Sequence, residues 1–362
     1  MIKNYKALLE NQELRMNPDK VELRKALKDE LQLTPYNTVQ YIKKAMFGVE
    51  ELYTRQTVDA GNKVKNQLSS KISNVSFEFQ GSVMTNTHIR GYSDIDLLTI
   101  TEKFHTFDRN DISKTLNQPN VYSKYTQSQI NSLTIALTGG GYSNGLNDLR
   151  ELRTDCESTL GSVYNRVNTS KPKSIEVETT NPKRKVDVVV ACWYNDANYY
   201  INGDNINRAI QVFCKGKMPI YDKKLDADYP FLRIKLLNEK DNIVNGRLKR
   251  MIRLLKTIKY DSEQEIKLSS FDINAIIYDV DTWKYSSKSY LELVPIVYEQ
   301  LKKLADNFSY RYNLKSLDGK EFIFRKEDQI TEDSEKSLFL KALIDEVEYL
   351  LQEMRLSISL IA

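Results

Sequence analysis

The stretch that decides the fold is residues 76–100, which read SFEFQGSVMTNTHIRGYSDIDLLTI. An alternating segment leads into the Gly81-Ser82 turn, and a polar loop then leads into a β-rich segment that carries Asp94 and Asp96. Residues i and i+2 of a strand share one face, so these two carboxylates are expected to project side by side. Adjacent carboxylates repel each other, and a divalent metal on oxygen ligands is the usual solution. For a bare D-x-D pattern, a solvated strand end with two surface acids is the competing interpretation.

The Gly-Ser turn strengthens the metal interpretation. A Gly-Ser turn after a strand exposes backbone N–H groups and a hydroxyl group to a phosphate. Eleven residues lie between Ser82 and Asp94.

A third acid, Asp187, lies in the segment KVDVVVAC at 185–192. Its β-branched residues predict a strand in the interior of a sheet. A carboxylate at the head of an apolar strand costs free energy unless it is paired or metal-bound. The competing interpretation is that Asp187 is exposed at the first turn of the strand, or pairs with Lys183 or Lys185.

Composition bounds the possible functions. A chain of 362 residues is long enough for one large or two modest domains, and a net charge of +4 does not by itself predict a nucleic-acid binder. Three cysteines without C-x-x-C spacing argue against a disulfide framework or a structural zinc site, and fit a reducing cytosol. Two histidines argue against a His-rich metal site or a serine-type triad. No signal sequence and no run of roughly 18 apolar residues is present, so we expect a cytoplasmic protein without membrane spans.

Hydrophobic periodicity predicts the elements of the first half. Residues 1–70 are predicted to be helical. Asn17-Pro18 and Thr34-Pro35 each place a capping residue before a proline at the start of a helix. The second of these starts one long helix, from Pro35 to about Ile72, that joins two lobes. Gly48 and Gly61 are possible bends in this helix. Strands are predicted at 74–80, 94–101, 174–179 and 185–192, a helix at 147–167, a turn at Asn181-Pro182, and a polar loop or lid at 104–146 that ends in Gly139, Gly140 and Gly141.

The second half reads as helical from a composition shift near residue 220. Nine Lys and Arg residues against two acids lie between Arg233 and Lys259, and Lys249, Arg253 and Lys256 form a stripe opposite an apolar face. Such a stripe is either a solvated face or a set of phosphate contacts. Further helices are predicted from Ser269-Ser270-Phe271 and at 291–304 and 333–354, with a turn at 317–320.

Together these motifs resemble the conserved motifs of a known enzyme family. Gly81-Ser82, Asp94-Ile95-Asp96 and Asp187 resemble the polymerase-β-type nucleotidyltransferase signature. With the basic helix and the Ser-aromatic helix that follow, the order is similar to that of the bacterial cyclic GMP–AMP synthase/DncV-like nucleotidyltransferases (CD-NTases) of CBASS antiphage defence. The resemblance covers residues 35 to 355, and it is weakest in 104–170.

The resemblance implies roles for particular residues. Asp94, Asp96 and Asp187 would be the catalytic acids and would bind two Mg²⁺ ions, for which Mn²⁺ can substitute. Gly81 and Ser82 would hold the β- and γ-phosphates of a nucleotide. Lys256 and Ser270 would contact the donor triphosphate from the second lobe, and Phe271 either stacks on a base or belongs to the core.

The resemblance also implies a fold and an activity. The fold would be α+β and two-lobed, with a mixed or antiparallel sheet in residues 1–220, including the N-terminal spine helix, and a helical lobe in 221–362. The activity would be template-independent synthesis of a cyclic di- or trinucleotide from NTPs. Partners would be the NTPs, a CBASS effector that reads the product and accessory CBASS proteins, with no membrane and no required nucleic acid. The alternatives are transfer to an RNA 3′ end, an antibiotic or a protein, and a catalytically silent nucleotide or RNA sensor.

Overall fold

The computed structural model describes residues 3–14, 37–89, 94–216 and 221–359. The chain forms two compact units. The helical unit comprises Met1–Val49, Thr85–Ser93 and Leu236–Ala362, and the sheet unit comprises Glu50–Met84 and Asp94–Lys235. The boundary expected between residues 220 and 221 stays a prediction.

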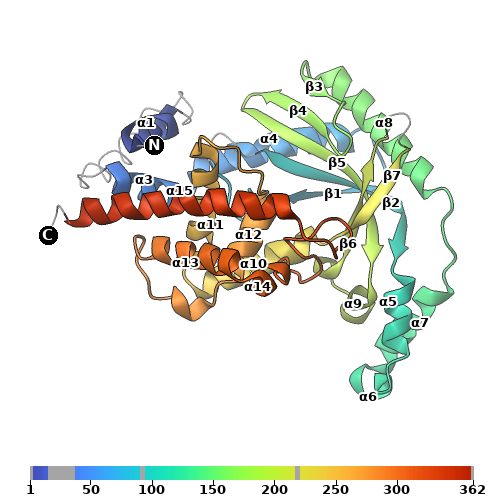
Figure 1. Ribbon diagram of the computed structural model, residues 1–362. Helices are drawn as coiled ribbons and strands as arrows, with labels where there is room; N and C mark the ends of the chain where they lie inside the picture. Colours follow the sequence, from blue (N-terminus) through green and yellow to red (C-terminus); the bar gives the residue numbers. More distant parts are fainter. Residues whose placement is uncertain (1–2, 15–36, 90–93, 217–220, 360–362) are drawn as a thin grey trace. The chain divides into compact units, whose positions relative to one another are not determined.

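The sheet unit is built on one mixed seven-stranded sheet (Figure 1). Its central path runs β1-β2-β5-β4-β3, while β6 pairs with β5 and β7 pairs with β6. Only β2 and β5 are parallel among these pairs. The strands are β1 (Val75–Gln80), β2 (Ile95–Phe107), β3 (Val167–Asn168), β4 (Ile175–Thr180), β5 (Lys183–Asn195), β6 (Ala209–Cys214) and β7 (Lys223–Asp228). The four predicted strands therefore correspond to β1, β2, β4 and β5, while β7 shows that strands continue beyond residue 220.

Two helices cover one face of this sheet, namely α4 (Glu51–Ser69) and α8 (Gly145–Val163). Alternation along the strands places every second apolar side chain against them. The core on this face includes Ala60, Val64, Leu68, Leu97, Leu149, Cys156, Val186 and Val188. A smaller cluster lies on the other face of the same strands, formed by Leu98, Ile100, Val189, Ala191, Trp193 and Ile210.

The segment predicted as a polar loop is mostly regular structure, so that prediction is wrong for 104–138. Strand β2 continues to Phe107, and three helices follow: α5 (Arg109–Leu116), α6 (Val121–Lys124) and α7 (Gln127–Thr138). Its few apolar residues are nevertheless buried, because α5 and α7 pack with α9 (Ala197–Asn202) through Ile112, Leu133 and Ala197. The three glycines after α7 lie outside regular structure, as predicted.

The helical unit has its own apolar core. Its helices are α1 (Tyr5–Leu14), α3 (Asn37–Met46), α11 (Arg247–Asp261), α12 (Ser270–Tyr278), α13 (Leu293–Asp306), α14 (Phe308–Tyr312) and α15 (Ser334–Ser359). Helix α10 (Pro230–Ile243) contains the passage from the sheet unit into this one. Helices α13 and α15 run side by side in it (Figure 1). The predicted α+β class, with a mixed sheet and a helical C-terminal part, is confirmed.

The single long helix predicted over 35–72 is two helices. Helix α3 ends at Met46 and α4 begins at Glu51, and residues 48–50 between them are not helical. The break coincides with Gly48, whose backbone loses more entropy on helix formation than any other residue. Gly61 lies inside α4 and does not break it. The Phe79 and Ile95 side chains occupy the space where a Cβ would stand, which is a reason for glycine at this position. The expected helix starts at Asn17-Pro18 and Thr34-Pro35 lie outside the described residues.

No described helix is both long enough and apolar enough to cross a membrane.

One buried arginine ties a loop of the sheet unit to α8. Arg153 is 1% exposed and forms an ion pair with Glu157 at 2.8 Å. Its guanidinium also donates to the carbonyl oxygens of Lys171 at 3.0 Å and Ser174 at 2.9 Å. The loop between β3 and β4 therefore takes its shape from a residue of α8.

Replacing Arg153 with alanine is expected to destabilise the protein by about 1–3 kcal/mol, because the carbonyl oxygens of Lys171 and Ser174 lose their donor and the half-buried Glu157 keeps only Lys215 as a partner among the described residues. Urea unfolding measures this change. The control is Arg150→Ala on the same helix, which removes a half-exposed ion pair to Asp222 and should cost less than about 1 kcal/mol. Equal losses in the two variants would contradict the anchoring role of Arg153.

Candidate active site

Four side chains form a row across the middle of the sheet. The register pairs Gln80 of β1 with Asp96 of β2, Asp96 with Asp187 of β5, and Asp187 with Glu176 of β4. Neighbouring strands lie about 4.8 Å apart, and paired residues project to the same face. The row therefore brings two of the predicted acids next to each other and adds a third carboxylate, from Glu176, that the sequence analysis did not select.

Alternation explains why the acids share a face. Asp96 precedes Leu98 by two residues, and Asp187 precedes Val189 by two, so each acid lies on the face of the smaller apolar cluster. Asp94 stands one residue before β2 begins. The same face is thus polar near the start of β2 and apolar further along it.

A lysine from the loop after β3 binds the end of this row. The Lys171 ammonium donates to Glu176 at 2.7 Å and to both oxygens of Asp187 at 3.2 and 3.4 Å. The Ser174 hydroxyl donates to Asp187 at 3.1 Å. Both residues belong to the loop that Arg153 holds through its backbone carbonyls. Asp187 is therefore paired, but with Lys171 rather than with Lys183 or Lys185, which were the partners considered from the sequence.

The electrostatics of the row reflect crowded negative charge. Burial, together with the charges of Asp187 and Asp94, raises the pKa of Asp96 to about 7. Burial and the charge of Asp187 also raise the pKa of Asp94. A hydrogen bond from Lys171 lowers the pKa of Glu176. Burial alone would lower the pKa of Lys171, but its hydrogen bonds to Glu176 and Asp187 raise it overall.

The donor chemistry of these residues fits a divalent cation. Carboxylate oxygens are the ligands that Mg²⁺ prefers, and the mutual repulsion of Asp94, Asp96 and Asp187 would be relieved by a bound cation. In the described part of the chain, however, no three His, Cys, Asp or Glu side chains are gathered closely enough to hold one ion. The assignment of the three aspartates as metal ligands therefore stays a prediction.

Gly81 has a geometric reason to be glycine. Its φ of +90° is in the region that side chains disfavour, and a Cβ there would lie 2.4 Å from Oδ2 of Asp96. The turn after β1 is thus fitted directly against the Asp96 carboxylate. Ser82 follows in the same turn, and its predicted phosphate contact is untested.

The loop between this turn and Asp94 belongs to the helical unit. Thr85–Ser93 is grouped with α11, although the segments on either side of it belong to the sheet unit. The Lys256 ammonium donates to the carbonyl oxygen and to Oγ1 of Thr87, both at 3.1 Å. The Arg253 guanidinium donates to the carbonyl oxygens of Met46 at 2.9 Å and Asn86 at 2.6 Å.

These contacts correct the picture of α11 as a helix with a solvated basic stripe. Arg253 is 6% exposed and Lys256 is 2% exposed, and Lys249 forms an ion pair with Asp241 at 3.4 Å. Arg253 and Lys256 thus bond to backbone oxygens within the helical unit. The predicted contact of Lys256 with a donor triphosphate is untested.

The other two predicted nucleotide-binding residues lie at the start of α12, in the helical unit. Ser270 is exposed, and the helix is capped by the preceding Ser269, which exchanges hydrogen bonds with Asp272. Phe271 is partly buried against the core of the helical unit, which agrees with the core interpretation. The structure gives no test of a stacking or triphosphate contact for either residue.

Sequence reasoning missed Glu176, Lys171 and Ser174. In IEVETT, Glu176 lies between two apolar residues and looks like an ordinary outward-facing strand residue. Only the pairing of this strand with the segment around Asp187 could have identified it. Lys171 and Ser174 lie in a short polar loop, where no pattern identifies a partner across the sheet.

Comparisons with known proteins give consistent results. Residues 235–348 match the cGAS/DncV-like nucleotidyltransferase C-terminal helical domain. The chain is 41% identical over 349 residues to a c-di-GMP synthase of Capnocytophaga granulosa, covering 96% of each chain. It is 40% identical over 338 residues to a c-di-GMP synthase of Flavobacteriaceae sp. genome_bin_11, covering 90% of this chain and 91% of that one.

A solved structure is similar over nearly the whole length. It is that of a STING-associated CdnE c-di-GMP synthase from Flavobacteriaceae sp., with a TM-score of 0.81 and 36% sequence identity. The match covers 98% of this chain and 99% of that one.

The burial of Lys256 predicts a pH-dependent stability. Burial lowers the pKa of Lys256 from 10.5 to about 7, so the unfolded chain holds this proton more tightly than the folded one does. Folding is therefore favoured increasingly as pH rises from about 7 towards 10.5, by at most about 1.4 kcal/mol per pH unit. Lys256→Met keeps the length of the stem and should abolish this gain. Urea unfolding of both proteins between about pH 7 and 9 measures it, and a constant difference between them would contradict the prediction.

Proposed function

Because the chain belongs to the cGAS/DncV-like nucleotidyltransferases, as its motifs predicted, we propose that it makes cyclic di-GMP from two molecules of GTP. The observation that carries this proposal is the row of Asp96 and Asp187 on adjacent parallel strands, with Gly81 fitted against Asp96. Relatives with 41% and 40% identity over nearly the whole chain are c-di-GMP synthases, which supports GTP as the substrate.

The reaction consists of two transfers. A ribose hydroxyl oxygen of one GTP forms a bond to the α-phosphorus of the other, the bond from that phosphorus to the β-phosphate oxygen breaks, and pyrophosphate leaves. The hydroxyl proton passes to a base or to water. A second transfer in the opposite direction closes the ring and releases a second pyrophosphate.

The residues of the sheet unit divide this work. The backbone of Gly81 and the hydroxyl of Ser82 would hold the β- and γ-phosphates of the donor, because a turn after a strand presents N–H groups to an anion. Asp187 would lie at the attacking hydroxyl and accept its proton. Lys171 and Ser174 hold Asp187 in place through hydrogen bonds to its carboxylate.

Asp94, Asp96 and Asp187 would hold two Mg²⁺ ions, or Mn²⁺ in their place. When bound, such ions make the hydroxyl more acidic and offset the negative charge of the phosphates. The crowded carboxylates support this assignment because a cation would relieve their repulsion. Asp96 lies between the Gly81 turn and Asp187, so its loss should be felt at both.

The biological setting proposed here is CBASS signalling. The product would be read by an effector protein, and accessory CBASS proteins would control the synthase. We propose a cytoplasmic location and no requirement for nucleic acid. The absence of membrane-crossing helices from the described residues is compatible with that location.

Asp96→Asn should reduce synthesis of c-di-GMP from GTP and Mg²⁺ or Mn²⁺ by at least about a hundredfold, because the carboxylate between Gly81 and Asp187 loses its charge. Mass spectrometry of phosphatase-resistant products measures the yield. Asp59→Asn is the matched control, since it removes an exposed carboxylate of α4 in the same unit and should leave the yield unchanged. Products that are linear and phosphatase-sensitive, or label from the α-phosphate transferred to added RNA or to protein, would contradict the proposal.

Gly81→Ala should lower the rate at least about tenfold, because its Cβ would displace the Asp96 carboxylate. The matched control is Gly203→Ala, where φ is +64° and no atom lies within 4 Å of the new Cβ. Both variants should lose roughly 1–2 kcal/mol of stability to backbone strain, and only Gly81→Ala should lose activity. Steady-state rates and urea unfolding measure the two effects. Equal rates of synthesis in the two variants would show that the close approach of Gly81 to Asp96 does not matter for activity.

A further inference from the structure

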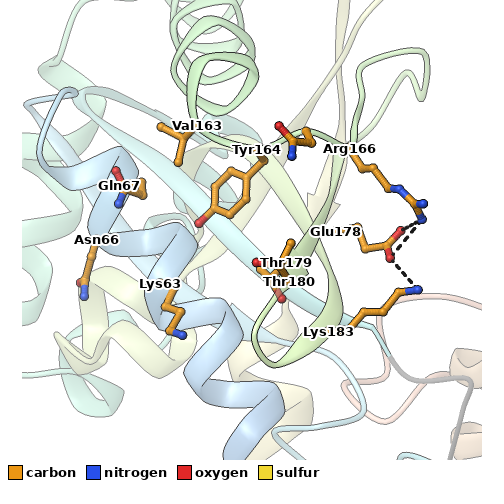
Figure 2. Close-up of a pocket in the computed structure, with 11 residues that line it drawn as sticks. Lys63, Asn66, Gln67, Val163, Tyr164, Arg166, Glu178, Thr179, Thr180 and Lys183 are labelled. Carbon is orange, nitrogen blue, oxygen red and sulfur yellow. Dashed lines mark hydrogen bonds and ion pairs between the residues drawn. The ribbon is translucent and has the colours of Figure 1, made fainter.

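A pocket in the sheet unit lies apart from the row of acids. It has a volume of about 780 Å³ and is formed by α4, the end of α8, the start of β3 and the β4–β5 hairpin (Figure 2). Its lining does not include Asp94, Asp96 or Asp187. A volume of this size is in the range of small-molecule sites.

We propose that this pocket binds a nucleoside monophosphate, with the base against the Tyr164 ring and the phosphate on the Lys63 ammonium. The proposal rests on the chemistry of the lining and is independent of the reaction assigned to the acids. Binding of a nucleoside monophosphate requires a flat surface for the base, polar groups for the edge of the base, and an unpaired positive charge for the phosphate.

The flat surface comes from Tyr164, which ends α8. Its ring is half-buried, and Figure 2 shows it beside α4 with its hydroxyl end on the side of Lys63. Burial raises the pKa of Tyr164, so the ring is a neutral phenol at physiological pH. Aromatic rings of this kind stack on bases with little dependence on sequence.

The polar groups come from one face of α4. Lys63, Asn66 and Gln67 follow one another at helical spacing of three and four residues, so their side chains emerge together. All three are exposed. Side-chain amides both donate and accept hydrogen bonds, which is the capability needed at the edge of a base.

The charge in the pocket is positive. Three cations and one carboxylate line it. Glu178 pairs with both Arg166 at 3.0 Å and Lys183 at 3.2 Å, as the dashed lines in Figure 2 mark. The Lys63 ammonium instead donates to the carbonyl oxygen of Asn181, and Lys63 forms no ion pair with any described residue. Its charge is therefore available to a phosphate.

A nucleotide explains this lining better than a polymer does. A strand of RNA needs cations at repeated intervals along a groove, whereas here a single uncompensated cation, one ring and three side-chain amides line one pocket. That arrangement has room for one base and one phosphate.

The test measures binding of GMP to the full chain without metal ions, by isothermal titration calorimetry in the Asp96→Asn background. Lys63→Ala should weaken binding about tenfold or more, because a charge-assisted hydrogen bond to phosphate contributes roughly 1.5–3 kcal/mol. Tyr164→Ala should weaken it by a similar factor. Guanosine and inorganic phosphate should each bind more weakly than GMP.

The matched control is Lys65→Ala, which removes the same charge from the same helix at a position outside the pocket lining. It should change the affinity less than about twofold. Lys63→Ala in the otherwise unaltered enzyme should retain full synthesis of the cyclic product, which establishes that it folds. Absence of GMP binding, affinity that Lys63→Ala leaves unchanged, or an equal loss with Lys65→Ala would overturn the proposal, as would preferential binding of an RNA oligonucleotide.

Discussion

Parallel pairing of β2 with β5 places Asp96 beside Asp187, and the rest of the sheet unit is arranged around that pair. Each strand is 13 residues long and buried along most of its length. Helices α4 and α8 cover one face of the sheet, which is apolar. Because side chains alternate between the two faces, the acids lie on the opposite face. A shift of either strand by one residue would turn its own carboxylate towards the apolar core under α4 and α8.

Crowding of like charge in the row is offset by lysines at one end. Lys171 bonds to Glu176 and Asp187 but not to Asp96, which lies on the other side of Asp187, and Lys185 pairs with Glu176 at 3.3 Å. The row is therefore neutralised at the Glu176 end, whereas burial and the charges of Asp187 and Asp94 raise the pKa of Asp96 at the other end. The loop that carries Lys171 depends in turn on Arg153, so a buried arginine of α8 supports the charge balance at the acids.

The sequence predicted those parts that local pattern controls. Strands β1, β2, β4 and β5 follow from alternation and β-branched residues, and the Gly81 turn follows from its composition. Contacts that depend on tertiary packing were not predictable. The stripe of Lys249, Arg253 and Lys256 looks solvated on a helical projection, yet tertiary contacts cover it, and nothing local marks Lys171 as the partner of Asp187.

Asp96 and Asp187 are 91 positions apart in the chain, although they are neighbours in the sheet. Pairing of such distant segments requires the whole intervening chain to be synthesised and the entropy of closing that loop to be overcome. During synthesis the segment with Gly81, Asp94 and Asp96 therefore emerges well before its partner strand exists. A nascent or truncated chain that stops before β5 holds two of the acids without the third, so the proposed set of catalytic acids is complete only once β5 has joined the sheet.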